Sequence, residues 1–314
     1  MRVLASNPFT VGELLEIVSQ VRTENTTFDG LTNGFDYNNP VIPASFVAVN
    51  TDDAKWNSPD IQWDNGLVIQ DQSGNQFVWV PIDGTNVPYS KWTISGVIYS
   101  NSNLSDDTLP SGFNENAMIN KYKGFYIARY EASFNYNEGN IRPRFKKSIN
   151  KTTSNWSRTS SYDGYLWNYI NYIDAKLYSE NMASKYGYDE SKVLTNLVTG
   201  TQWDTVMKWI KNSGKNVIDS RSWGNYDNSI SPANVAGYSN LQISGYSNYW
   251  KAKNIYDLAG NTWEWTNEKY WSDFVFRGGY YDNDATSHPV SFRYSGSNTY
   301  GSPYLSFRSS LYIN

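Results

Sequence analysis

The chain has 314 residues, a net charge of −4 and no cysteine, which excludes disulfides, thiolate metal sites and thiol nucleophiles. Its single histidine, His288, argues against histidine-rich metal sites and most Ser-His-Asp arrangements, because one residue would have to serve every role. The sequence has no basic stripe, which argues against nucleic acid as a partner.

Aromatic residues make up 17% of the chain and charged residues 18%, which is below the usual share of about a quarter. The polar residues are mostly Asn, Ser, Thr and Tyr, the residue types of binding loops. No stretch of about 20 apolar residues occurs, so we expect no membrane span. The opening segment, MRVLASNPFTVGELL, contains too short a run of apolar residues for a signal peptide. Whether the chain is mature, truncated or released without cleavage stays open; phage structural proteins fit the last case.

Residues 1–45 are predicted to be an appendage that carries one short amphipathic helix. Thr10 and Glu13 have the spacing of a capping box, and apolar residues recur at helical spacing until about Thr23. The apolar face of such a helix needs a partner. Either the helix packs on its own domain, or it attaches the protein to a larger assembly or to a second copy of the chain. The remaining residues, 46–314, are predicted to form one domain.

Strands are predicted from Val41 onward. Residues 45–49, 66–70 and 76–82 are rich in β-branched and aromatic residues. The turn residues 71–75 lie between the second and third of these runs, which predicts a hairpin.

Two helices are predicted in the middle of the chain. The first covers residues 165–186, with an apolar stripe of Leu166, Tyr169, Ile170, Ile173 and Leu177. The second covers residues 202–211, with Thr201 and Asp204 as its capping box, and it buries Trp203, Val206, Met207 and Ile210. Residues 89–113 and 221–248 are predicted to be irregular, and loops of that length are uncommon unless they serve a function.

The chain is organised around residues 254–279, NIYDLAGNTWEWTNEKYWSDFVFRGG. Gly260 and Asn261 predict a turn, because both residue types tolerate unusual backbone angles. Trp263 and Trp265 alternate with Glu264, so a strand here places both indoles on one face and the carboxylate on the other.

The run DLAGNTWEWT followed by FRGG resembles the formylglycine-generating-enzyme family, also called sulfatase-modifying factors, a branch of the C-type-lectin fold. FVWVPI, KGFYIARYEAS, LVTGTQWDTVMKW and the final SFRS are similar to further family segments in family order, although Val198, Gly200 and Gln202 depart from the pattern. The resemblance covers roughly residues 75–314. It implies an irregular α+β domain of the C-type-lectin type with little regular secondary structure. It also implies a strand within residues 123–133 that enters the core.

The resemblance does not extend to the chemistry of the family. Its enzymes bind copper through two cysteines, and a relative of the same fold holds iron through three histidines. This chain has no cysteine and one histidine, so neither site can be built. We therefore expect no enzymatic activity and no required cofactor; an enzyme of this fold with unrecognised chemistry, or a purely structural phage or surface component, stays the alternative.

The last segment, RGGYYDNDATSHPVSFRYSGSNTYGSPYLSFRSS, interleaves apolar residues with Tyr, Ser, Asn, Asp, Gly and Thr, as binding loops do. It resembles the variable region of proteins diversified by retroelements, which lies at the C-terminal end of a lectin-like domain. The resemblance implies a variable ligand-binding region at 280–304, whose candidate residues are Tyr280, Tyr281, Asp282, Asp284, Ser287, His288, Tyr294, Ser295, Ser297, Asn298, Tyr300, Ser302 and Tyr304. The fixed framework would be Val290, Phe292, Leu305 and Phe307. The alternative is ordinary loop residues with the polar bias of the whole chain.

Family members also bind a structural calcium ion near the central turn. The matching positions here are Asp257, Gly260, Thr262 and Glu264, and hard oxygen ligands from one turn suit calcium. In the alternative, Glu264 caps backbone amides or pairs with an arginine.

The sequence therefore predicts a ligand-binding protein without enzymatic activity, either a phage receptor-binding protein or a bacterial surface adhesin. Its partner would be a protein or glycan on a cell surface, and its location the tail of a virion or the bacterial surface.

Overall fold

The computed structural model describes residues 22–27, 39–49, 65–92, 103–111, 113–135, 140–142, 165–230 and 239–314. The helix expected from residue 10 onward falls on residues outside these ranges. The helix and the boundary of the appendage at residue 45 therefore stay predictions.

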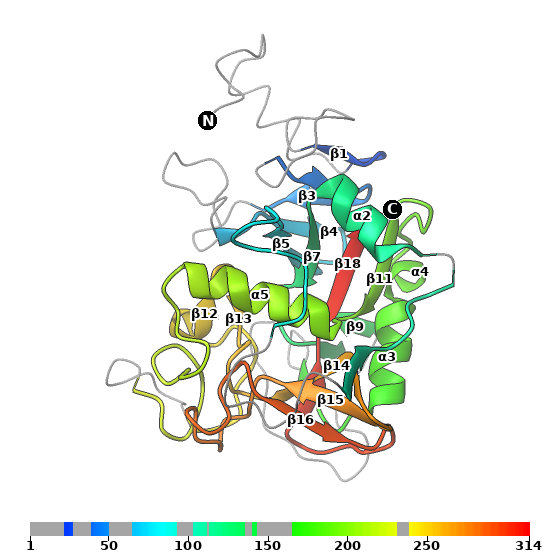
Figure 1. Ribbon diagram of the computed structural model, residues 1–314. Coiled ribbons are helices and arrows are strands. Elements are labelled where there is room, and N and C mark those ends of the chain that lie inside the picture. Colours follow the sequence, from blue (N-terminus) through cyan, green and yellow to red (C-terminus); the bar gives the residue numbers. More distant parts are fainter. Residues whose placement is uncertain are drawn as a thin grey trace.

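A six-stranded antiparallel sheet joins the two ends of the described chain (Figure 1). Its order is β11-β18-β7-β5-β4-β3, with bounds Val193–Leu197, Ser309–Ile313, Gly124–Ala128, Gln76–Pro81, Val68–Asp71 and Phe46–Ala48. The predicted hairpin is confirmed as β4 and β5, which pair Val68 with Val78. The strand expected within 123–133 is β7, at the centre of the sheet.

A second sheet carries the C-terminal half of the chain in the order β16-β15-β14-β17. The strands are Arg293–Gly296, Asp273–Arg277, Trp263–Tyr270 and Leu305–Phe307. β14 pairs antiparallel with β15 and parallel with β17, and its far end pairs with β6, Leu104–Asp106. β6 lies in the segment that was expected to be irregular.

The remaining strands form small sheets, and short helices complete the described chain. β1 (Thr26–Thr27) pairs with β2 (Val41–Ile42), β8 (Ser133–Asn135) lies between β9 (Asn140–Arg142) and β10 (Tyr165–Leu166), and β12 (Lys251–Ala252) pairs with β13 (Ile255–Tyr256). The short helices are α2 (Glu115–Tyr122), α4 (Met182–Lys185) and the 3₁₀ helix η3 (Asn248–Trp250).

Helix α5, Gly200–Asn212, crosses the molecule between the two larger sheets (Figure 1). Its N-cap is Thr199, which forms a reciprocal capping box with Gln202. The predicted capping box of Thr201 and Asp204 is therefore wrong by two residues, because the observed box begins two residues earlier in the chain. The predicted apolar face is confirmed, because Trp203, Val206, Met207 and Ile210 are all buried in one core cluster with strands of the six-stranded sheet.

The helix expected over residues 165–186 is shorter and faces differently. It is α3, Tyr172–Glu180, followed by the single turn α4. Its buried residues are Tyr172, Ala175 and Ser179, whereas Ile173 and Leu177 of the predicted stripe are 47% and 49% exposed. The spacing of apolar residues identified a helix but assigned its buried face wrongly.

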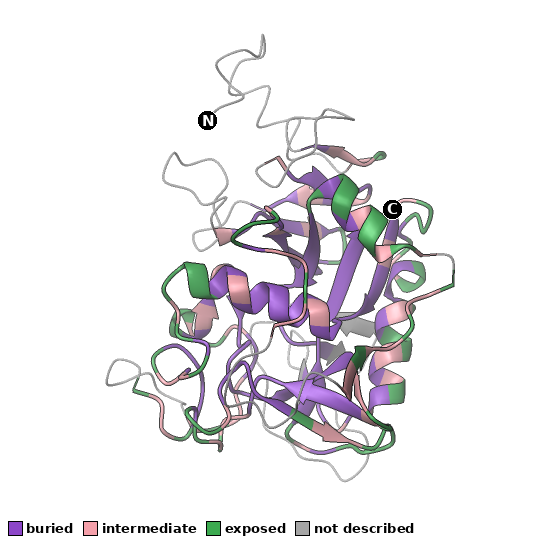
Figure 2. Cartoon of the chain, in the orientation of Figure 1, coloured by how far each residue is buried: buried purple, intermediate pink, exposed green. Residues whose placement is uncertain are grey.

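The described residues confirm an irregular α+β fold, in which short elements are joined by long loops that are partly buried (Figure 2). The aromatic core is also as expected: Trp79, Trp203, Trp223, Trp250 and Trp265 are among the largest fully buried side chains. In the described part of the chain, no helix is long and apolar enough to cross a membrane.

Candidate functional site

The second sheet has two chemically different faces, because successive side chains of a strand alternate. The aromatic face carries Trp263, Trp265, Phe276 and Tyr294. The ionic face carries Glu264, Glu268, Arg277 and Arg293. The pairing register aligns aromatic residues with aromatic ones and charged residues with charged ones, since Phe276 pairs with Tyr294 and Arg277 with Arg293 across β15 and β16. The alternation predicted around Glu264 is thus confirmed and extends over three strands.

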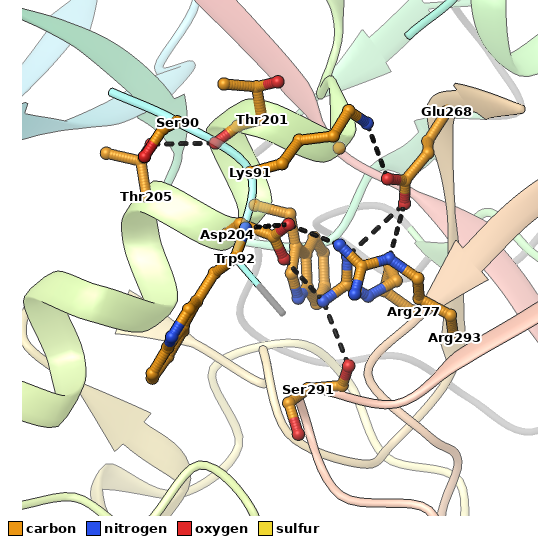
Figure 3. Close-up of polar contacts among 12 residues, drawn as sticks. Ser90, Lys91, Trp92, Thr201, Asp204, Thr205, Glu268, Arg277, Ser291 and Arg293 are labelled. Carbon is orange, nitrogen blue, oxygen red and sulfur yellow. Dashed lines mark hydrogen bonds and ion pairs between the residues drawn. The ribbon is translucent and has the colours of Figure 1, made fainter. Parts of the chain in front are cut away.

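The ionic face is buried against α5 and is held by a closed network of charges (Figure 3). Arg277 donates to Asp204 of α5 at 3.0 Å, and Arg293 donates to Glu268 at 3.0 Å and also to Asp204. Lys91 completes the network with a 2.7 Å contact to Glu268. Burial alone would raise the pKa of Glu268, but Arg293, Lys91 and Arg277 hold it at about 2. The carboxylate is therefore ionised at neutral pH, and the network fixes the position of β16.

The aromatic face is filled by rings that touch each other. Trp265 meets Phe276 edge to face at 5.0 Å between centroids, and Phe276 lies 5.4 Å from Tyr294. The indole nitrogen of Trp265 donates to the carbonyl of Ile170 at 2.9 Å, so the buried polar atom is satisfied. Such contacts between rings stabilise beyond the area that they bury, by about 0.5–1.5 kcal/mol each. This face is a stiff platform.

Five tyrosines belong to the outer edge of this platform or lie next to it, and we call them the tyrosine patch: Tyr280, Tyr281, Tyr294, Tyr300 and Tyr304. Tyr280 lies 4.5 Å from Tyr304 and 5.5 Å from Tyr281 between ring centroids. The ring of Tyr300 lies over Gly296, where a Cβ atom would meet it at 3.4 Å. Tyr294, Tyr300 and Tyr304 are 47%, 49% and 37% exposed, and Tyr280 and Tyr281 are half-buried. Tyr280, Tyr281 and Tyr304 therefore form one cluster of rings, Tyr300 is an electrostatic neighbour of Tyr280, and Tyr294 packs on Phe276.

The other predicted ligand-binding residues lie on the loops around the patch. Asp282, Asp284, Ser287, Ser297 and Asn298 are exposed, and Ser295 is half-buried. The carboxylate of Asp284 also accepts from the backbone amides of Thr286 and Ser287 at 2.8 and 2.9 Å, which makes its loop a defined turn.

His288 and Ser302 differ from the rest of the set. His288 packs edge to face on Trp263 and Phe292, and burial lowers its pKa, so it is neutral at physiological pH. Ser302 is buried, and its carbonyl accepts from the amide of Tyr169 at 2.9 Å. The contacts of Ser302 place it in the framework that holds the loop. The predicted framework residues Val290, Phe292, Leu305 and Phe307 are all buried.

The residues matched to a calcium site lie close together, but Glu264 has a protein partner. Its two oxygens accept from Arg308, which also donates to the carbonyls of Ala128 and Tyr256 at 3.1 Å. This arrangement matches the alternative in which Glu264 pairs with an arginine. A carboxylate whose two oxygens both accept from a guanidinium is poorly suited to bind a cation. Among the described residues, no group of three or more Asp, Glu or His side chains could hold a metal ion.

The neighbours of Glu264 form a buried acidic cluster that the sequence did not reveal. Asp257 accepts from Ser244 and Gly245 through one oxygen, its other oxygen has no protein partner, and burial raises its pKa to about 7. Glu131 accepts from Asn261 at 2.6 Å and from Thr262, and burial raises its pKa as well. Thr262 is therefore bonded to Glu131, while Gly260 forms a backbone bridge with residue 225.

Comparison with known proteins gives similarities of chain arrangement only. No protein-family model matches the chain, and no curated protein matches it. Similar solved structures include CarF, with 13% identity and a TM-score of 0.48 over 76% of this chain and 98% of CarF. They also include PvdO from Pseudomonas aeruginosa, with 13% identity and a TM-score of 0.41 over 79% of this chain and 98% of PvdO.

A third similar structure is variable protein 1 of Treponema denticola, with 13% identity and a TM-score of 0.35 over 66% of this chain and 98% of that protein. At these values the likenesses assign neither an activity nor a ligand.

Proposed function

We propose that this protein binds a surface ligand through the tyrosine patch and performs no reaction of its own. The observation that carries the proposal is the exposure of several tyrosines over a stiff aromatic platform. Tyrosine supplies a large amphipathic contact area at low cost in conformational entropy. Because the platform is already ordered, little further ordering is needed when a ligand binds.

The two-faced sheet also supports the proposal that residues 280–304 are diversified. The exposed residues of this segment lie in loops apart from Tyr294, which is in β16, whereas Val290, Phe292, Leu305 and Phe307 are buried. Exposed loop positions tolerate substitution, because their side chains make few contacts with the core. The role would be that of a phage receptor-binding protein or a bacterial adhesin, on the tail of a virion or on the cell surface.

Burial argues against the buried acidic cluster as an enzymatic centre. Perturbed pKa values are typical of active sites. However, the side chains of Glu131, Asp257 and Glu264 are each 0% exposed, so a substrate cannot reach them. Their bonds to Asn261, Thr262 and Arg308 indicate that they hold the central turn in place.

A cell-binding experiment tests the proposal. Fluorescently labelled protein is applied to a panel of intact bacterial strains and measured by flow cytometry. We expect binding to at least one strain, and a loss of at least about 30-fold in the triple variant Tyr294→Ser, Tyr300→Ser, Tyr304→Ser, because a single binding hot spot contributes about 2 kcal/mol or more. Tyr249→Ser is the matched control, since Tyr249 is 54% exposed and lies outside the patch. Equal binding by the triple variant and the control would refute the proposal, as would no binding to any strain.

A further inference from the structure

Large apolar side chains outside residues 280–304 are exposed beside the tyrosine patch. Ile173 and Leu177 of α3 are 47% and 49% exposed, and Trp271 is 71% exposed. Single exposed apolar residues are ordinary, whereas a group of them on one surface marks an interaction site. The question is whether these three belong to the same surface as the patch.

The start of α3 lies directly beside the loop that follows β16. The amide of Ile173 donates to the carbonyl of Asn298 at 3.4 Å. Tyr172 stacks on Phe274, the second residue of β15, with 3.6 Å between ring centroids. Leu177 is one turn further along α3 and faces the same side as Ile173. The exposed apolar side of α3 is therefore continuous with the loop that carries Asn298 and Tyr300.

Trp271 lies at the tip of the hairpin between β14 and β15. The strands pair Tyr270 with Asp273, so the turn consists of Trp271 and Ser272 alone. Trp271 has φ of +55°, the left-handed region that two-residue turns usually fill with Asn or Gly. A bulky residue held in this conformation and left exposed is not explained by packing. Strain of this kind is a reason to look for a function.

The register of the sheet places this tip beside the same loop. Phe274 pairs with Gly296, so the start of β15 lies next to the end of β16. The hairpin tip and Ser297 are therefore at one end of the sheet, about two strand spacings, or ~10 Å, apart. Ile173, Leu177 and Trp271 thus border the loop of the tyrosine patch, and we call them the constant patch.

We propose that the constant patch is a second, invariant half of the binding surface and that the ligand is a folded protein. This inference rests on the proposed function. Ile173 and Leu177 offer no polar group to sugar hydroxyls, and they contribute to binding only by being buried against apolar atoms. An exposed tryptophan is the residue type most typical of an energetic centre in protein interfaces.

A selection experiment with defined probes tests the inference. The full chain is displayed on phage with Tyr294, Asn298 and Tyr300 randomised, and the library is sorted separately against lysozyme and against dextran. Lysozyme stands for a folded protein and dextran for a neutral glycan. Selected clones are then given Ile173→Ser or Trp271→Ser, with Tyr249→Ser as the matched control, and their thermal stability is measured to confirm folding.

We expect lysozyme binders of different sequence, each weakened at least tenfold by Trp271→Ser and by Ile173→Ser and unchanged by the control. Lysozyme binders that are indifferent to both substitutions would overturn the inference and leave the proposed function intact. Binders obtained only against dextran would likewise overturn it. A library that yields no binder to either probe would contradict the proposed function as well.

Discussion

Replacing Arg293 by Met is expected to destabilise the protein by about 3 kcal/mol. The side chain of Arg293 is 1% exposed, and it bonds to Glu268 at 3.0 Å and to Asp204. Removing one partner of a buried ion pair costs about 3–5 kcal/mol, because the remaining charge loses its compensation. Arg277 still lies 3.0 Å from Asp204 and Lys91 2.7 Å from Glu268, so the lower end of that range applies.

The expected shift in melting temperature follows from the length of the chain. An entropy of unfolding of about 2.1 cal/mol/K per residue gives about 0.66 kcal/mol/K for 314 residues, so the melting temperature should fall by about 5 °C. Differential scanning calorimetry measures this shift. The double variant Arg293→Met, Glu268→Gln removes one charge of each sign and is expected to recover part of the loss.

Arg221→Met is the matched control, because Arg221 pairs with Asp219 at 2.6 Å on the surface, where ion pairs contribute little. The control should leave the melting temperature unchanged. An Arg293→Met variant with the same melting temperature as the control would refute the reasoning, since the network would then not hold the sheet against α5.

Three further predictions concern the framework, the acidic cluster and calcium. Phe292→Ala is expected to lower the free energy of unfolding, measured in urea, by about 3–5 kcal/mol, because Phe292 is 4% exposed. Asn298→Ala should change it by no more than about 0.5 kcal/mol, and equal losses in the two variants would contradict a division into buried framework and exposed binding residues. Burial raises the pKa of Asp257 from 3.8 to about 7, so the folded protein binds the proton more tightly and loses stability as pH rises from about 4 to about 7. Burial also raises the pKa of Glu131, so Asp257→Asn should reduce this decline without abolishing it, and an unchanged decline would reject a contribution from Asp257. Because Glu264 is paired with Arg308, excess chelator is expected to leave the melting temperature unchanged, and a fall would show that calcium binds.

The sequence predicted the features that depend on short spacings along the chain. The hairpin of β4 and β5 follows from a turn between two β-rich runs, and the structure confirms that these strands pair. The opposite orientation of Trp265 and Glu264 follows from the alternation of a strand. The framework positions Phe292 and Leu305 could be named because apolar residues stand out in a segment of Tyr, Ser and Asn.

Features that depend on distant partners could not be predicted in this way. Asp204 was assigned to a helix cap, whereas it binds Arg277 and Arg293, which lie 73 and 89 positions further along the chain. Apolar spacing placed Ile173 and Leu177 in the core, but their surroundings depend on where α3 meets the second sheet. No local signal distinguishes a buried stripe from one that faces a partner.

The account depends on a constant frame that presents a changeable surface, and gene sequences from sister isolates test this most directly. The prediction is that differences between isolates gather in codons 280–304, at exposed positions such as Asn298 and Tyr300, and spare Phe292 and Phe307. Trp271 should also be unchanged. Differences scattered evenly along the gene, or found at the buried framework positions as often as at the exposed ones, would contradict the account.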